Sequence, residues 1–424
     1  MATSSAAEIP YTRGVTPPET REGRGRPPLA AHWLLDPAVE FLNHGSFGAC
    51  PRSVLAVQRE LREEMERRPV AFLARELPDR LDATRSELGA FLGADPEGLA
   101  FVANATAGVN AVVRSFPLVA GDELLTTDQA YNACRNVLEY VAEGSGARVV
   151  VAPLPFPVAG PAQAVEAVLA AVTPRTRLAL LDHITSPTGL VLPVAELVAR
   201  LEERGVATLV DGAHAPGSVE LTLETLGASW YTGNLHKWVC APKGSGFLWA
   251  REDRREETVP AVISHGWNTP RPGRSRYHDL FDWTGTFDPT AVLAVPAALR
   301  TMASLVPGGW PEVRRRNREL ALAARRELAA ALAVPPPCPD SMIASLAALP
   351  LPDAPPGAEP RGALYLTPLQ EALMDRYRIE VPIVPWPRHP RRLVRVSAQL
   401  YNHLPQYRRL GEALLTLLRE ETPA

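Results

Sequence analysis

The sequence predicts an α/β protein in which a large domain, built on a mostly parallel sheet, precedes a smaller α+β lobe. Between residues 98 and 250, short apolar runs alternate with helical stretches, as in a parallel sheet covered by helices on both faces. After a proline-rich break at 335–339, the pattern changes to short helices and strands. The chain has 424 residues, 46% of them apolar. Because a single core rarely grows past roughly 300 residues, two lobes are expected.

Each element follows from local patterns. Residues 1–33 are rich in Pro, Gly and Arg, which predicts a disordered or draped tail. Residues 34–69 form a segment that joins the small lobe and the active site, and 70–289 form the large domain. Apolar residues at spacings of three and four predict helices at 53–68, 77–93, 291–305, 310–333, 366–377 and from Pro405 onward. Strands are expected at 98–104, 122–127, 147–152, 176–182, 206–212, 228–237, 244–250, 379–385 and 392–398. Residues 290–424 hold the connector helices and the small lobe.

Composition excludes several classes of function. A net charge of −3 and a pI near 6.3 give no reason to expect nucleic acid or an anionic membrane as a partner. No apolar run reaches the roughly 18 residues of a membrane span, and the first 30 residues lack the apolar segment of a signal peptide. A cytoplasmic protein is expected. The four cysteines show no metal-ligand spacing, so we interpret them as packing residues and predict no metal site.

The stretch "GNLHKWVCAPKG" at 233–244 contains the only two lysines of the chain, Lys237 and Lys243, whereas the other 42 of its 44 basic residues are arginines. Arginine stays protonated at physiological pH, but a desolvated lysine amine can lose its proton and attack a carbonyl. Lys237, between His236 and Trp238, is therefore the candidate for covalent chemistry. Lys243 is expected on a surface or loop.

Asp211 ends the apolar strand "ATLVDG", at the edge where open α/β sheets bind their ligands. Aspartates at strand ends also cap turns, but the lysine after the next strand favours a pyridoxal phosphate site. Lys237 would hold the cofactor aldehyde as a Schiff base, and Asp211 would keep the pyridine nitrogen protonated.

The cofactor phosphate needs backbone amides at a helix N-terminus. The segment "FVANATAGVN" offers them at Asn104, Ala105 and Thr106, which otherwise form an ordinary capped helix start. Asn234 and His236 could donate further hydrogen bonds to this phosphate.

The motifs "VDGAHAPG", "GNLHKW", "SPTGLVLP" and "LVRVSAQLYN" resemble, in order and spacing, class V aminotransferase-fold enzymes of the isopenicillin N epimerase-like branch. The resemblance covers residue 34 to the C-terminus. It implies the pyridoxal phosphate (PLP)-dependent transferase fold type I with a seven-stranded sheet. It also implies the Schiff-base role of Lys237, the pairing of Asp211 with the pyridine nitrogen, and a place for His214 near the phenolic oxygen of the cofactor.

The same resemblance implies further roles. Tyr131 would stack on the cofactor ring, although a tyrosine at a helix start is otherwise a core aromatic with a wet end. Arg395 would grip the substrate α-carboxylate, with Ser186 nearby. Asn43 and His44, in "FLNHGSFGACP", would belong to a loop that closes over the substrate, and otherwise form a glycine-rich turn. Thr286 would reach the phosphate in the neighbouring subunit, which implies a homodimer with shared active sites.

The sequence leaves the reaction open. Loss of the α-proton leads to epimerisation, C–S lysis, transamination or C–C bond formation, depending on the fate of the carbanion. An amino-acid epimerase is the main prediction, and a C–S lyase acting on cysteine conjugates or on hercynylcysteine sulfoxide is the alternative. A desulfurase is disfavoured because no cysteine occupies the expected loop. An epimerase needs a second acid, for which His44, His183 and Tyr131 are candidates by type. Residues 264–283 are expected to line the substrate pocket.

Overall fold

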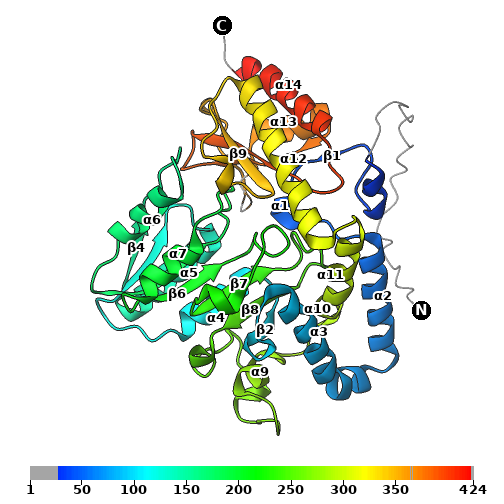
Figure 1. Ribbon diagram of the computed structural model, residues 1–424, viewed down its shortest axis with the longest axis vertical. Helices are drawn as coiled ribbons and strands as arrows, with labels where there is room; N and C mark the ends of the chain where they lie inside the picture. The colour runs from blue at the N-terminus through cyan, green and yellow to red at the C-terminus, as the bar shows by residue number, and fades with distance from the viewer. Residues whose placement is uncertain (1–26, 363, 365, 422–424) are drawn as a thin grey trace, which may run out of the picture.

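The structure is a computed structural model that describes residues 27–362, 364 and 366–421 (Figure 1). Its centre is a seven-stranded sheet in the order β2-β8-β7-β6-β5-β3-β4, in which only β8 runs antiparallel to its neighbours. The strands are β2 (Leu99–Val102), β3 (Glu123–Thr127), β4 (Arg148–Ala152), β5 (Thr176–Asp182), β6 (Ala207–Asp211), β7 (Trp230–Asn234) and β8 (Gly246–Ala250). The predicted mostly parallel, seven-stranded sheet is confirmed.

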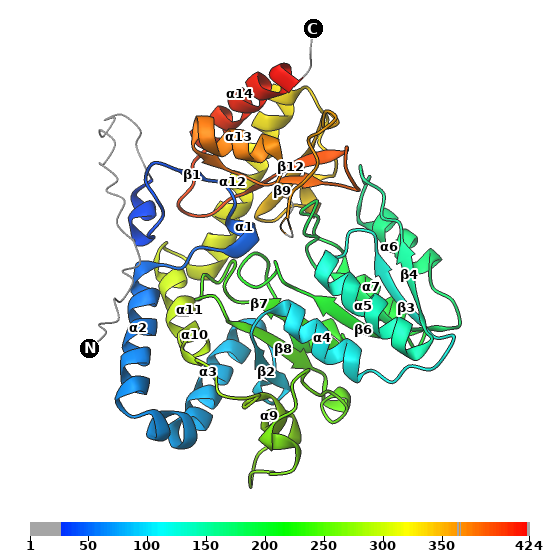
Figure 2. The ribbon, with the colours of Figure 1, turned by 180° about the vertical axis from the view of Figure 1, so that it is seen from behind.

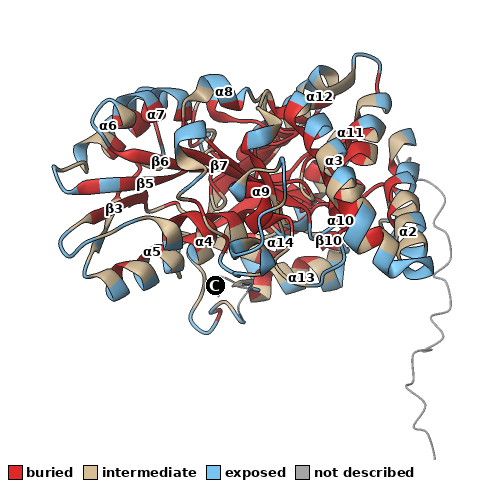
Figure 3. Ribbon diagram, turned by 90° about the horizontal axis from the view of Figure 1, so that it is seen from below, coloured by how far each residue is buried: buried red, intermediate tan, exposed pale blue. Residues whose placement is uncertain are grey.

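Helices cover both faces of this sheet (Figure 3). α4 (Ala105–Ser115) and α5 (Asn132–Ser145) pack together on one face, and α6 (Pro161–Ala170), α7 (Val194–Glu202) and α8 (Leu223–Leu226) on the other. Every residue of β3, β6, β7 and β8 is buried. This double burial explains why these strands lack the alternation of apolar and polar residues that a half-exposed strand shows.

The N-terminal and connector helices form one side of the molecule. They are α1 (His44–Phe47), α2 (Arg52–Arg67), a π-helical turn at Ala71–Glu76, α3 (Leu77–Leu92), α9 (Arg276–Phe281), α10 (Thr290–Leu293), α11 (Val295–Ser304) and α12 (Gly309–Leu332). The predicted helix 291–305 is interrupted at Ala294, just before Pro296, because proline cannot donate the backbone hydrogen bond that a continuous helix requires. Within the described ranges, no single helix is long and apolar enough to cross a membrane, and only the pair Thr290–Ser304 and Gly309–Leu332, bent by 70°, meets that length and composition.

The small lobe contains a three-stranded antiparallel sheet in the order β11-β12-β9, with α13 (Pro368–Tyr377) and α14 (Leu404–Glu421) (Figure 2). Its strands are β9 (Leu346–Leu351), β11 (Ile383–Pro385) and β12 (Arg392–Ser397). Residues 379–385, predicted as one strand, form two. β10 (Ile379–Glu380) pairs with β1 (Glu40–Phe41) near the N-terminus, and β11 pairs with β12. Pro382 lies at the break, where a missing N–H disfavours a continuous ladder.

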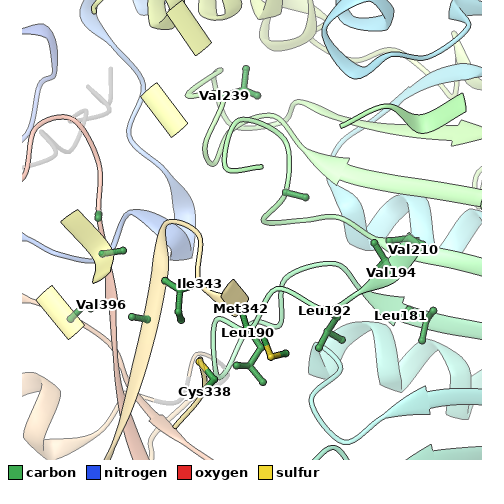
Figure 4. Packing of buried hydrophobic residues seen from close by; sticks show 14 of the residues in the cluster. Leu181, Leu190, Leu192, Val194, Val210, Val239, Cys338, Met342, Ile343 and Val396 are labelled. Atoms are coloured by element: carbon green, nitrogen blue, oxygen red, sulfur yellow. The ribbon is translucent and has the colours of Figure 1, made fainter. Parts of the chain in front are cut away.

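The two lobes share one hydrophobic core (Figure 4). This core extends from Leu181 and Val210 of the large sheet, through Leu190, to Ile343 and Val396 of the small lobe. A backbone hydrogen bond of 2.9 Å from the Val191 N–H to the Met342 carbonyl reinforces this junction. The two lobes are therefore packed directly against each other.

Most of the predicted tail, residues 1–26, lies outside the described residues. Its last part packs against the body of the molecule. A 3-10 turn at Pro28–His32 leads to Trp33, which is 1% exposed and donates from Nε1 to the Ala49 carbonyl at 3.1 Å. The ring of Trp33 meets that of Tyr401 edge-on at 5.0 Å. Trp33, the last residue of the predicted tail, is therefore a core residue.

Candidate active site

The candidate site lies where the strands of the large sheet end and face the small lobe (Figure 2). Asp182, Asp211 and Asn234 are the last residues of β5, β6 and β7, and Asn104 caps α4 directly after β2. Because these strands run parallel, their carboxyl ends meet at one edge. The small lobe contributes Arg395 from β12.

Lys237 lies in the loop between β7 and β8, and its Nζ is 3.0 Å from Nε2 of His214. The pKa of Lys237 is lowered to about 7. Burial is the main cause, and the positive charge of Arg395 contributes to the same shift. Burial, followed by the charge of Lys237, also holds the pKa of His214 well below its usual range. The site therefore favours a neutral amine beside a neutral imidazole, as a nucleophilic lysine requires.

Asp211 is 4% exposed and lies under the site. Its Oδ1 accepts from the Ala213 N–H at 2.9 Å, and its Oδ2 from the Cys134 thiol at 3.3 Å. Burial raises its pKa, and among the residues described here it forms no ion pair. A buried carboxylate without a cationic partner is costly, which suits a cationic group of a ligand. Cys134, interpreted from the sequence as a packing residue, is also a contact of this carboxyl group.

The first turn of α4 is where the phosphate is predicted to bind. The Asn104 side chain caps the helix by accepting from the Ala107 N–H at 2.9 Å, and Asn234 Oδ1 accepts from the Ala105 N–H at 2.8 Å. Thr106 follows in the same turn. His236 lies nearby, with Nδ1 3.4 Å from the Ser245 carbonyl. Asn234 thus faces the helix start with its acceptor oxygen, which leaves its amide group as the donor.

Arg395 joins the two lobes. It is 5% exposed and donates to the Ser186 carbonyl, to Ser186 Oγ at 3.3 Å and to Ser46 Oγ at 3.0 Å. Ser46 in turn donates to Asn43 Oδ1 at 2.5 Å. Burial lowers the Arg395 pKa to about 10, so the guanidinium stays charged at neutral pH. The predicted residues Asn43, Ser186 and Arg395 therefore form one group.

His44 was expected to contact the substrate, but its ring is engaged by other parts of the chain. Its ring is fully buried, with Nδ1 2.7 Å from Tyr401 Oη and Nε2 2.9 Å from the Lys237 carbonyl. Burial lowers its pKa to about 3. With both ring nitrogens engaged, His44 connects the small lobe to the lysine loop and does not present a free nitrogen to a substrate.

Tyr131 and His183 lie at the other end of the site. Tyr131 precedes α5, is 46% exposed, and interacts electrostatically with Arg395. His183 Nδ1 is 2.8 Å from Tyr231 Oη. Burial lowers the His183 pKa to about 4.

Two expectations concern the segment before α10. Thr286 lies on an exposed loop, and a cavity of about 290 Å³ separates the neighbouring residues Thr284 and Phe287 from Ala103 and Ala107 at the start of α4. That residues 264–283 line the substrate pocket stays a prediction. Within one chain, His278 and Tyr277 bind the carbonyls of Leu99 and Leu248, and Leu99 is at the opposite end of β2 from the site.

Two site residues were missed by sequence reasoning. Asp182 is 4% exposed at the end of β5, directly paired in register with Asp211. The sequence could have identified Asp182, since it ends the apolar run "TRLALLD" in the same way as Asp211 ends "ATLVD". Cys134 gave no such signal, because its contact with Asp211 depends on how α5 packs.

These residues fit the pyridoxal phosphate that the resemblance implies. Asp211 offers a buried carboxylate for a protonated ring nitrogen. Nδ1 of His214 is buried with no hydrogen-bond partner in the described part of the chain, so a polar atom of a ligand would satisfy it. The N-terminus of α4 suits a phosphate, and the Lys237 amine is available for the aldehyde.

Comparisons with known proteins agree with this geometry. Residues 41–334 match the family model "Aminotransferase class-V". The chain is 40% identical over 397 residues to isopenicillin N epimerase of Amycolatopsis lactamdurans, covering 90% of this chain and 96% of that protein. It is 30% identical to a probable chloroplastic L-cysteine desulfhydrase of Arabidopsis thaliana, covering 91% and 84% respectively.

The fold is also similar to that of solved structures. A variant of the cystine C–S lyase C-DES, with glycine covalently linked to its PLP cofactor, superposes with a TM-score of 0.75 at 21% identity. The match covers 89% of this chain and 96% of that one, and confirms the PLP-dependent transferase fold type I. The chain belongs to the aminotransferase class-V family, and pyridoxal 5′-phosphate is its cofactor.

Proposed function

We propose that the protein is an amino-acid epimerase of the isopenicillin N epimerase kind. The observation that carries the proposal is that Lys237, whose pKa burial lowers to about 7, interacts electrostatically with the charged, buried Arg395 of the small lobe. This pairing suits a substrate with a free α-carboxylate and an α-proton. The 40% identity to an isopenicillin N epimerase favours epimerisation over C–S lysis, for which the corresponding identity is 30%.

Each residue has a defined task in this proposal. Bound at the site, the cofactor supplies an electron sink that makes the α-proton acidic. Asp211 would hold the proton of its ring nitrogen, and His214 would bind its phenolic oxygen. Its phosphate would be held by Asn104, Ala105, Thr106, Asn234 and His236. Arg395, Ser186 and Asn43 orient the substrate, because a planar guanidinium matches a carboxylate.

An epimerase must remove the α-proton on one side and return one on the other. Lys237 is the base on its own side. For the opposite side, Tyr131 is the best placed of the three candidates, because it is exposed in the site and interacts with Arg395, the residue that would hold the substrate. His44 has both ring nitrogens engaged, and His183 is bound to Tyr231.

Three finer points belong to the same proposal. The active unit is a homodimer in which Thr286 completes the phosphate site of the partner. The chain divides at residues 34, 70 and 290, and residues 34–69 link the small lobe, through β1, to the site. The location is cytoplasmic, as expected from the sequence.

The test is to incubate the holoenzyme with single enantiomers of amino acids and cysteine conjugates, in D₂O, and to follow the D/L ratio, pyruvate and α-deuterium together. An epimerase changes the D/L ratio without forming pyruvate. Pyruvate without a change in the D/L ratio would instead support C–S lysis.

Tyr131→Phe sharpens the test. Loss of one acid should slow epimerisation at least about 100-fold. The remaining Lys237 should still exchange the α-hydrogen of one enantiomer only. Tyr140→Phe, an exposed tyrosine on α5, is the matched control and should behave as wild type. Equal exchange of both enantiomers by Tyr131→Phe would remove Tyr131 from this role.

A further inference from the structure

The site contains two carboxyl groups where one would suffice to hold a ring nitrogen. Asp182 and Asp211 end neighbouring parallel strands and are direct register partners. Side chains at paired positions project from the same face of a sheet. The His183 N–H donates to the Asp211 carbonyl at 2.9 Å, which fixes the two strand ends together. The two carboxyl groups therefore lie side by side beneath the site.

Few charges surround this pair. Each aspartate is 4% exposed, and no Arg, Lys or His forms an ion pair with either one in the ranges that the structure describes. The groups facing Asp182 are Asp211 from β6, Cys134 and the Tyr131 backbone N–H from the start of α5, and Lys237 from the β7–β8 loop. The pKa of Lys237 is lowered to about 7, so this amine carries only part of a positive charge at neutral pH. Two buried, neighbouring carboxyl groups without a full compensating charge cannot both be ionised.

The proposed pairing of Asp211 with the ring nitrogen decides which of the two is the anion. Hydrogen bonds favour the ionised form of both, because Asp211 accepts from the Ala213 N–H and the Cys134 thiol, and Asp182 accepts from the Tyr131 N–H and its own N–H. Burial, followed by the negative charge of Asp211, raises the pKa of Asp182 well above its usual range. Asp182 is thus the carboxyl group that keeps its proton.

We propose that Asp182 is a positioning residue for Asp211, present as a neutral carboxylic acid, so that the pair holds a single negative charge matched to one protonated ring nitrogen of the cofactor. This inference rests on the proposed role of Asp211. If Asp182 were also ionised, the two negative charges together would bind the ring proton more tightly than the Asp211 carboxylate does alone. The neutral acid instead supplies a polar, hydrogen-bonding neighbour without adding charge.

Infrared difference spectroscopy on the holoenzyme tests this directly. At neutral pH, the wild-type minus Asp182→Asn spectrum should contain the carbonyl stretch of a protonated carboxyl group, shifted in D₂O. Asp122→Asn, at the amino end of β3, is the matched control and should give no such band. Carboxylate bands in place of the protonated band would overturn the proposal.

Cofactor binding gives a second, independent measurement. Because the asparagine is neutral and similar in shape, Asp182→Asn should keep the cofactor Kd within about 3-fold of wild type and keep its visible absorption spectrum at neutral pH. Asp211→Asn should weaken binding at least about 10-fold and change the spectrum.

The two variants separate the two ideas. If Asp211→Asn binds the cofactor like wild type, the proposed role of Asp211 fails. If Asp211→Asn is impaired and Asp182→Asn is equally impaired, the single-charge pair is wrong and Asp182 is ionised. If Asp182→Asn does not fold, the pH titration of the protonated carboxyl band in wild-type protein still decides, since an ionised Asp182 would show no such band at neutral pH.

Discussion

Lys237 is a lysine whose surroundings prepare it to react. Burial and the charge of Arg395 bring its pKa to about 7, so the neutral amine becomes the main form only above that pH. The rate at which cofactor-free protein recaptures pyridoxal phosphate should therefore rise about tenfold per pH unit below pH 7 and level off above it. Stopped-flow absorbance between pH 5.5 and 9 measures this. A rate still rising tenfold per unit between about pH 8 and 9 would indicate an ordinary lysine.

Substitution separates the two lysines. Lys237→Ala should abolish turnover, by at least about 1,000-fold, while some cofactor still binds noncovalently through the α4 start and Asp211. Lys243→Ala should retain most of the activity, because Lys243 is exposed and its Nζ donates only to the Gly48 carbonyl, at 3.0 Å. Steady-state kinetics and cofactor absorbance after dialysis report both effects. Equal losses in the two variants would contradict the assignment of Lys237.

At this scale, sequence reasoning could name candidates where residue type alone indicates chemistry. The scarcity of lysine pointed to Lys237, and a carboxylate at a strand end pointed to Asp211. It failed where a role depends on packing. The family resemblance made His44 a candidate substrate contact, but the fold turns its ring toward Tyr401 and the Lys237 carbonyl. Asp182 is related to Asp211 only through the strand register.

Among the elements, the turn that ends α1 is the most constrained. Gly48 has φ = +69°, and a Cβ there would lie 1.8 Å from the His236 carbonyl oxygen. Gly48→Ala should therefore cost at least about 2 kcal/mol and loosen the Lys237 loop, since both the backbone conformation and the contact oppose it. Gly121→Ala is the matched control, because Gly121 also has a positive φ, +91°, but open space around it.

The control should lose only about 1 kcal/mol. Urea unfolding of both variants, together with cofactor loading, measures the difference. Equal destabilisation would mean that the backbone conformation alone matters and that the contact with His236 relaxes.

The prediction of elements was most accurate where the apolar period is strong. The central strands of the large sheet, β6 and β8, were recognised because every residue in them is buried. β9 was not predicted, because "LAALPL" combines alanines with a proline and lacks the β-branched residues typical of strands. It forms because six consecutive residues pair with β12. Tertiary pairing, rather than local propensity, makes this strand.

For the whole molecule, the shared active site is the main prediction. Val262, Ile263 and Phe287 are large apolar residues between 39% and 57% exposed, and Val262 and Phe287 line the cavity beside the start of α4. A second copy of the chain would cover this surface. If Thr286 acts in the partner site, mixing inactive Lys237→Ala with inactive Thr286→Ala should restore up to about one quarter of the activity, because mixed dimers contain one intact site.

Sedimentation of the wild type should show a dimer, and the mixture should regain activity only after subunits exchange. A fully active monomer would rule out the shared site.

The two-lobed organisation was predictable from chain length and from the change in pattern at the prolines. The shared core between the lobes was not, because it depends on Leu190 and Ile343, which are distant in sequence.

The loop between β7 and β8 has one more consequence, because it carries every lysine of the chain. A lysine-specific protease can cut the denatured protein only after residues 237 and 243. Chemical reduction that makes the cofactor link permanent would block the first cut and leave the second. Protein with a linked cofactor gives the fragment 1–243, and protein without it gives the fragment 1–237. The ratio of the two fragments in a mass spectrum therefore measures the fraction of sites that hold the cofactor.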